Sequence, residues 1–471
     1  MSKWAELAIM AISAILALSR FAGLSRMSIW MDEAMSYFCS AGPWFKIRIL
    51  ETTIPPLYYL FANICLNIRD SEAFLRLPAA VAGALSVLAS YFLAKELGFP
   101  RMQRALVALF TSASPWLFFY SQEARSYTLV VLFCLLASIA FLRFERGKAW
   151  WLVCGAFLGL GLWSQYVVAF FTVGLWAYVL AFRRERPVIM GLLVSTIIAS
   201  LTFLPWAIYA FSNPPPPVSI KKTPLGEMMS FVYGWFPYFF GFSLGPSVRE
   251  IRIEGIWAII REWPWLAAGG TAALLPVLKI GSLIRNKGFV FMLTCALLPP
   301  VLLLALSLLP GLNITHHPRY TAWSGVFLLF VWLWLAMSFK TRALSWISTA
   351  LMLGLMCVSD LNFFFNRRYY KEDVRSAAAL LRANRKADEP LFVASGNVGQ
   401  ALLYYYTESF VGIDRSTDQD TITLSGNRIW LMLSREWEVS TQPLMRRLEM
   451  GYRLSGDWDL PGVRLLLYER P

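Results

Sequence analysis

The chain has 471 residues, of which 57% are hydrophobic and 15% are charged, and its formal net charge is +14. Repeated apolar runs of about 18 or more residues, with a mean hydropathy of +0.53, exclude an ordinary soluble protein. A membrane β-barrel is excluded too, because alternating segments of about ten residues are not present. The sequence therefore predicts an all-α polytopic membrane bundle, in which each helix satisfies its own backbone.

The apolar runs predict about eleven transmembrane helices. They lie near residues 4–24, 75–94, 104–119, 126–142, 149–164, 166–182, 187–208, 264–280, 288–309, 321–338 and 343–361. The first run lacks the small-residue cleavage site of a signal peptide and more runs follow, so we expect it to be retained.

The positive charge has a topological explanation. If the N-terminus lies in the cytoplasm, every inner loop is basic, including segments 95–104, 143–148, 183–186, 279–287 and 340–342. This is the bias of the positive-inside rule, so the charge does not call for a nucleic-acid partner. An odd number of spans then places the C-terminus outside.

The composition changes after residue 365, where the chain becomes charged and amphipathic. The pattern predicts helices over 372–385, 398–406 and 443–450 and strands over 391–394, 429–433 and 463–468. Strands that alternate with helices indicate a small α/β domain. We thus expect a transmembrane domain over residues 1–365 and an extracytoplasmic α/β domain over 366–471.

The first outer loop, residues 25–74, holds the strongest candidates for chemistry. Asp32 and Glu33 are flanked by Trp30 and Met31, and an ionised carboxylate in such a setting is costly without a task or a partner. Either one of them is a general base toward a hydroxyl group, or both are solvated acids paired with basic residues of the loop. Residues 33–50 are expected to form amphipathic helices on the membrane surface.

Two further outer segments carry candidate residues. Glu123 and Tyr127 are four residues apart on one helix face, with Arg125 to the side, at the outer end of predicted spans. His316, His317, Arg319 and Tyr320 lie in a turn between two later spans. An arginine at the outer boundary suits a phosphate, because its planar fork matches phosphate oxygens, and Lys221 is expected to add charge. The histidines are either metal ligands with an acid of the first loop or hydrogen-bonded turn residues.

An aromatic stretch in the fourth outer loop, residues 231–240, has two interpretations. Aromatic residues near a membrane usually form an interfacial belt, whereas the same residues can line a channel for a lipid tail.

Six short motifs occur in a fixed order along the chain. They are MetAspGluAla at 31–34, ProProLeuTyrTyr at 55–59, LeuArgLeuProAla at 75–79, TyrSerGlnGluAlaArgSerTyr at 120–127, ArgTyr at 319–320 and LysGluAspValArgSerAlaAla at 371–378. The set resembles the bacterial relatives of protein O-mannosyltransferases and aminoarabinose lipid A transferases, and within them the RgtA/B/C/D-like branch of the GT-C glycosyltransferases.

This resemblance implies a GT-C fold in the bacterial cytoplasmic membrane. The enzyme is expected to transfer a sugar from a polyprenyl-phosphate donor to a lipid, glycan or protein acceptor on the outer face. By the same resemblance, Asp32 is the base with Glu33 beside it, Arg319 and Tyr320 match the donor-phosphate region, and Arg125 belongs to a motif at the cavity mouth. We expect the charges of Arg125 and Lys221 to add to the phosphate site. The cavity would be lined by Glu51, Tyr58, Tyr59, Glu123, Tyr127, His316 and His317.

The sequence departs from the family at Thr53 and Ile54, where relatives place Glu and His. No cofactor is therefore assigned with certainty, and a divalent metal remains open. The preferred hypothesis is direct, inverting displacement at the anomeric carbon. The rival hypothesis is a transporter or flippase of a lipid-linked sugar, which would use the same cavity without forming a bond.

Overall fold

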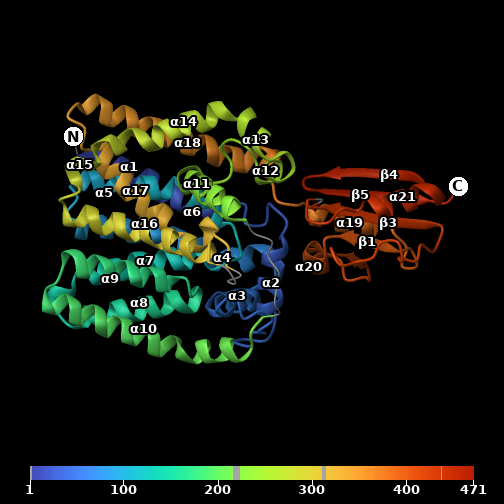
Figure 1. The fold of residues 1–471 in the computed structure, drawn as a ribbon, viewed down its shortest axis with the longest axis horizontal. Coiled ribbons are helices and arrows are strands. Elements are labelled where there is room, and N and C mark those ends of the chain that lie inside the picture. Colours follow the sequence, from blue (N-terminus) through green and yellow to red (C-terminus); the bar gives the residue numbers. More distant parts are fainter. Residues whose placement is uncertain (1–2, 216–222, 310–313, 436) are drawn as a thin grey trace.

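The computed structural model describes residues 3–215, 223–309, 314–435 and 437–471. Most of them form a helical bundle, with a small mixed sheet at one end (Figure 1). Within the described residues, six helical segments are long and apolar enough to cross a membrane, at Lys3–Phe21, Glu72–Glu96, Arg186–Ser212, Trp263–Leu283, Lys287–Ser307 and Arg342–Phe365. The all-α membrane bundle expected from the composition is confirmed.

The bundle helices follow the predicted apolar runs. They are α1 (Lys3–Leu18), α4 (Glu72–Glu96), α5 (Arg101–Ser112), α6 (Pro115–Ser121), α7 (Tyr127–Phe141), α8 (Ala149–Ser164), α9 (Val168–Phe182), α10 (Arg186–Ser212), α14 (Trp263–Leu274), α16 (Lys287–Ser307), α17 (Trp323–Ala336) and α18 (Arg342–Phe365). The run expected at 104–119 is split, because Ser114 caps α6 and Pro115 occupies its first turn. This break places the segment after α6, residues 122–126, next to the first outer loop.

The first outer loop contains two helices, α2 (Met31–Ser40) and α3 (Leu57–Ile68). The expectation of helices over 33–50 is right only as far as Ser40, since residues 41–50 are irregular. The buried Asn63 side chain holds the irregular segment by donating to the carbonyl oxygens of Ser40 and Gly42, at 2.8 and 3.1 Å. A loop whose carbonyls are paired in this way needs no helix to satisfy its backbone.

The residues after α18 form a five-stranded sheet in the order β2-β1-β3-β5-β4. The strands are β1 (Leu391–Ala394), β2 (Val411–Ile413), β3 (Arg428–Ser434), β4 (Arg453–Leu460) and β5 (Val463–Glu469), and the helices are α19 (Val374–Asn384), α20 (Gly396–Tyr405) and α21 (Gln442–Gly451). All six predicted elements are present. The sequence does not predict strands β2 and β4, because β2 has three residues and the edge strand β4 has no buried position.

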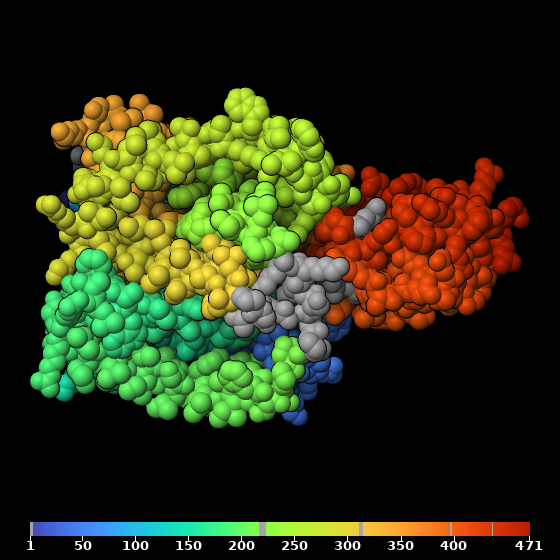
Figure 2. Space-filling model, viewed as in Figure 1, coloured from blue at the N-terminus to red at the C-terminus, as the bar shows by residue number. Residues whose placement is uncertain are grey.

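The sheet lobe sits on the end of the bundle that carries α2, and it projects beyond the helices in the space-filling view (Figure 2). Ser28 ties the two parts together, since its hydroxyl donates to the Glu372 carbonyl at 2.5 Å and accepts from the Val374 amide at 3.2 Å. The amide of Ile29 donates to the Tyr405 hydroxyl at 2.7 Å. These bonds fix the backbone directly before Asp32.

Candidate active site at the end of the bundle

Asp32 lies in the first turn of α2, where the positive end of the helix dipole favours a carboxylate. It is 8% exposed, and its Oδ2 atom is 3.2 Å from an Arg319 nitrogen and 3.7 Å from an Arg125 nitrogen. The site therefore joins residues nearly 300 positions apart in the chain. Three charged side chains that the sequence singled out meet at this point.

Glu33 faces a different set of partners. Both of its oxygens accept from Arg76 at 2.6 Å, and one also accepts from the Ala124 amide at 2.9 Å. The Lys371 ammonium is 3.4 Å away. Burial opposes the charge of Glu33, but Arg76 and Lys371 outweigh it and lower its pKa to about 2. Glu33 is thus a fully bonded anion, so its carboxylate has little freedom to accept a substrate proton.

Arg125 connects Asp32 to the irregular part of the first loop. Its guanidinium is 3.1 Å from Glu51 and 3.4 Å from the Tyr59 hydroxyl, which itself donates to Glu51. Tyr58 points elsewhere, because its hydroxyl donates to the Leu75 carbonyl at 2.8 Å in a fully buried position. The structure therefore brings Glu51 and Tyr59 to the site and leaves Tyr58 in the packing between α3 and α4.

Arg319 comes from the short 3-10 helix Pro318–Thr321. Its Nε atom is buried and has no hydrogen-bond partner within the described part of the chain. The Arg319 amide donates to Nδ1 of His317 at 3.3 Å, and the Tyr320 ring lies 5.5 Å from the guanidinium. Burial and the charge of Arg319 hold the pKa of His317 well below its usual value. His317 is therefore neutral at pH 7, and the cation of this turn is Arg319.

The aromatic stretch 231–240 belongs to α11 (Pro224–Phe240), which packs behind the Arg319 turn. The Tyr238 hydroxyl bonds Thr321 at 2.6 Å and the Pro318 carbonyl at 3.2 Å. The ring of His316 packs on Phe231, with 5.2 Å between the ring centres. Neither of its ring nitrogens has a partner among the described residues. Tyr238 and Phe231 of α11 therefore pack against the turn that carries Arg319.

Glu123 is buried, and its carboxylate is 3.8 Å from the Lys371 ammonium. Burial raises its pKa, and Lys371 opposes this effect. Tyr127 begins α7, is buried, and contributes to the electrostatic environment of Arg319. Lys221, the remaining predicted residue, lies outside the described residues.

Two functional neighbours were missed in the sequence. Arg76 and Lys371 lie inside motifs that were recognised, at 75–79 and 371–378, yet neither was assigned a role. Arg76 could have been found from the sequence, because it lies at the outer end of an apolar helix, where the positive-inside rule does not favour an arginine.

The residues around Asp32 do not form a metal site. Within residues 3–215, 223–309, 314–435 and 437–471, no three His, Cys, Asp or Glu side chains come together to hold an ion. Asp32 is paired with arginines instead. The donor set therefore does not fit a divalent metal at this position, and we assign no step to one.

A family model described as dolichyl-phosphate-mannose-protein mannosyltransferase matches residues 53–209. No curated protein matches the chain in sequence. ArnT from Cupriavidus metallidurans in the apo state is similar, with a TM-score of 0.59 at 11% identity over 98% of this chain and 97% of that chain.

Two ligand-bound structures share the fold as well. ArnT from the same organism, bound to undecaprenyl phosphate, has a TM-score of 0.50 at 14% identity and covers 99% of this chain and 98% of that chain. The oligosaccharyltransferase AglB from Archaeoglobus fulgidus, with an inhibitory peptide and a dolichol-phosphate, has a TM-score of 0.53 at 12% identity over 100% and 74% of the two chains. At these identities the likeness is one of fold, over nearly the whole length.

Proposed function

From the premise that this multi-pass membrane protein has the GT-C glycosyltransferase fold, we propose that it is a polyprenyl-phosphate-sugar-dependent glycosyltransferase. It moves a hexosyl or pentosyl group to an acceptor on the outer face of the cytoplasmic membrane. The anomeric centre is inverted and Asp32 is the general base. Residues 1–365 and 366–471 are its two domains, and the site lies where they meet.

One observation carries the proposal: a buried carboxylate stands 3.2 Å from an arginine whose Nε is unpartnered among the described residues. A guanidinium with free donor capacity is a ready partner for a phosphate diester. When the donor phosphate binds Arg319, it competes with Asp32 for that cation. The carboxylate is then released to accept a proton from the acceptor hydroxyl.

The reaction is a single displacement. The acceptor oxygen forms a bond to the anomeric carbon as the bond from that carbon to the phosphate oxygen breaks. The acceptor proton goes to Asp32, and the electron pair of the broken bond stays on the departing polyprenyl phosphate. Arg319 stabilises the charge of that leaving group. Attack from the face opposite the phosphate inverts the anomeric centre.

The other residues take supporting roles in this proposal. Arg125 and Tyr320 complete the phosphate site together with Arg319. Glu51, Tyr59, Glu123, Tyr127, His316 and His317 form the wall around the sugar. Glu33 is a positioning residue, because its bonds to Arg76 and to the Ala124 amide fix the turn that presents Asp32.

The ligands of the similar proteins support a prenyl donor. ArnT has been seen with undecaprenyl phosphate and AglB with a dolichol-phosphate, so the fold accommodates a prenyl chain with one phosphate at its head. The oligosaccharyltransferase from Archaeoglobus fulgidus, which has the same fold, has been solved with a tethered acceptor peptide, and this supports an acceptor-using transferase over a flippase.

The test is to incubate the purified protein in detergent with polyprenyl-phosphate sugars and envelope lipid, and to follow both by mass spectrometry. Release of free polyprenyl phosphate that requires added acceptor, with a matching mass gain on that acceptor, is the expected result. A donor that binds but stays intact with every acceptor class would overturn the proposal and favour a flippase.

A further inference from the structure

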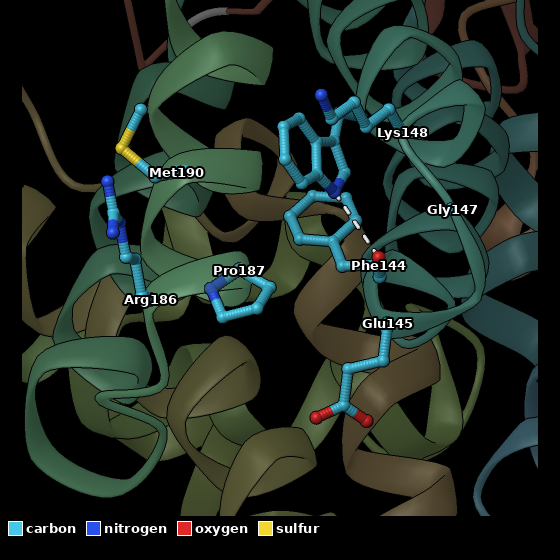
Figure 3. Close-up of a pocket in the computed structure, with 8 residues that line it drawn as sticks. Phe144, Glu145, Gly147, Lys148, Arg186, Pro187 and Met190 are labelled. Atoms are coloured by element: carbon cyan, nitrogen blue, oxygen red, sulfur yellow. Dashed lines mark hydrogen bonds between the residues drawn. The ribbon is translucent and has the colours of Figure 1, made fainter.

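A cavity of about 560 Å³ is lined by residues that Figure 3 shows, and it lies at the opposite end of the bundle from Asp32. Helix α4 runs along the bundle away from the sheet lobe. It begins at Glu72, which pairs with Arg375 of the sheet lobe, and it ends at Glu96. Glu96 pairs with Arg143 and Arg146, in the segment that borders the cavity. The cavity is therefore distinct from the site described above. It lies where α8 and α10 begin.

The walls of this cavity are amphipathic. Phe144, Trp151, Pro187 and Met190 supply apolar surface, and the Trp151 indole nitrogen is already bonded to the Phe144 carbonyl at 3.3 Å. Lys148 lies on one wall and Arg186 lies beside Met190 on the other (Figure 3). An apolar floor under two cations suits a ligand that has an apolar body and an anionic head.

The charges around the cavity are not balanced. Segments 143–148 and 183–186 contain six basic residues and two acidic ones. The acidic residue on the cavity wall is Glu145, and its carboxylate forms an ion pair with the Arg183 guanidinium at 2.8 Å. Lys148 and Arg186 have no ion-pair or hydrogen-bond partner for their side-chain nitrogens among residues 3–215, 223–309, 314–435 and 437–471. The cations on the two walls are thus available to one anionic group between them.

We propose that this cavity binds an anionic glycerophospholipid of the membrane, with its phosphate between Lys148 and Arg186 and its acyl chains against Trp151 and Met190. Charge complementarity selects the anionic head, and the volume is that of a small-molecule site. Exposed apolar side chains continue from the cavity along α10 at Leu193 and Ile197, which gives the chains a path into the bilayer. The site does not depend on the transferase activity proposed above.

The test uses the full-length protein, delipidated in a non-ionic detergent and titrated with phosphatidylglycerol under native mass spectrometry. Each surface cation contributes about fivefold in affinity, so Lys148→Gln with Arg186→Gln weakens binding about 30-fold. Arg146→Gln with Arg184→Gln removes the same charge from the same two segments outside the cavity, and it is expected to change the affinity less than threefold, as is roughly typical of screened surface charge. The swap Lys148→Arg with Arg186→Lys keeps the charges and retains binding, which separates lost charge from misfolding.

Phosphatidylcholine and inorganic phosphate are titrated in parallel, and both are expected to bind at least about tenfold more weakly, because each lacks one half of the recognised ligand. The proposal would be overturned if the cavity variant and the control variant lost the same affinity for phosphatidylglycerol, since binding would then depend only on total charge. Unchanged affinity in the cavity variant, or binding of inorganic phosphate as tight as that of the lipid, would overturn it too.

Discussion

The ion pair between Glu33 and Arg76 gives the sharpest stability prediction. Both side chains are essentially unexposed, and the two oxygen–nitrogen distances are 2.6 Å. Glu33→Gln removes the charge and one of the two acceptor oxygens, so the buried Arg76 guanidinium loses its anion and keeps only neutral acceptors, among them the carbonyls of Leu24, Met27 and Ser28. Breaking a buried pair in this way costs about 3–5 kcal/mol of unfolding free energy. The pKa of Glu33, lowered from 4.5 to about 2, corresponds to about 3 kcal/mol.

The assay is chemical unfolding in mixed micelles, at several pH values. Because the folded-state pKa is lowered, the stabilisation is complete above about pH 4.5 and is lost as the pH falls toward 2, with about 1.4 kcal/mol gone by about pH 3.5. Glu185→Gln is the control, since Glu185 forms an exposed pair with Arg183 that is worth less than about 1 kcal/mol. The reasoning would be refuted if the two variants lost equal free energies of unfolding. It would also be refuted if the difference in unfolding free energy between wild type and Glu33→Gln did not change with pH.

Three further predictions concern the site. Arg319→Lys keeps the charge but loses the planar fork, so donor affinity falls about tenfold in a polyprenyl-phosphate competition assay; unchanged affinity would remove Arg319 from the phosphate site. Tyr59→Phe deletes the hydroxyl that bonds Glu51 and contacts Arg125, and we expect turnover to fall by less than about tenfold, with a larger loss arguing for a direct chemical role. Lys371→Gln removes the cation that opposes the raised pKa of Glu123, so this pKa rises further and the Glu123 carboxyl band in infrared spectra titrates at higher pH than in the wild type; an unmoved titration would contradict the assignment.

The sequence predicted the overall architecture because membrane helices and alternating strand–helix patterns leave strong periodic signals. The C-terminal elements were found for this reason, down to the bounds of β1. Strand β4 was missed because its glycine and aspartates are unusual in a strand, and its antiparallel pairing with β5 is a tertiary contact. The break before α6 was readable, since Ser114 and Pro115 form a typical helix start.

The candidate site was predictable as a set of residues but not as a geometry. The adjacent carboxylates at 32 and 33 face different ways, since one meets Arg319 and the other Arg76. The sequence does not show which of the two carboxylates is held by buried ion pairs, because the partners of Glu33 come from α4 and from the segment before α19. Lys371 shows the difficulty, since it reaches Glu33 over 338 positions of sequence.

The most direct test of the account compares Asp32→Asn with Asp70→Asn. Asp70 belongs to the same loop, but it is exposed and bonded to Tyr37. Loss of a single general base lowers turnover by about a hundred- to ten-thousand-fold, so Asp32→Asn should lose that much while donor binding is retained. Asp70→Asn should keep wild-type turnover. An Asp32→Asn variant that turns over donor at the wild-type rate would contradict the central claim.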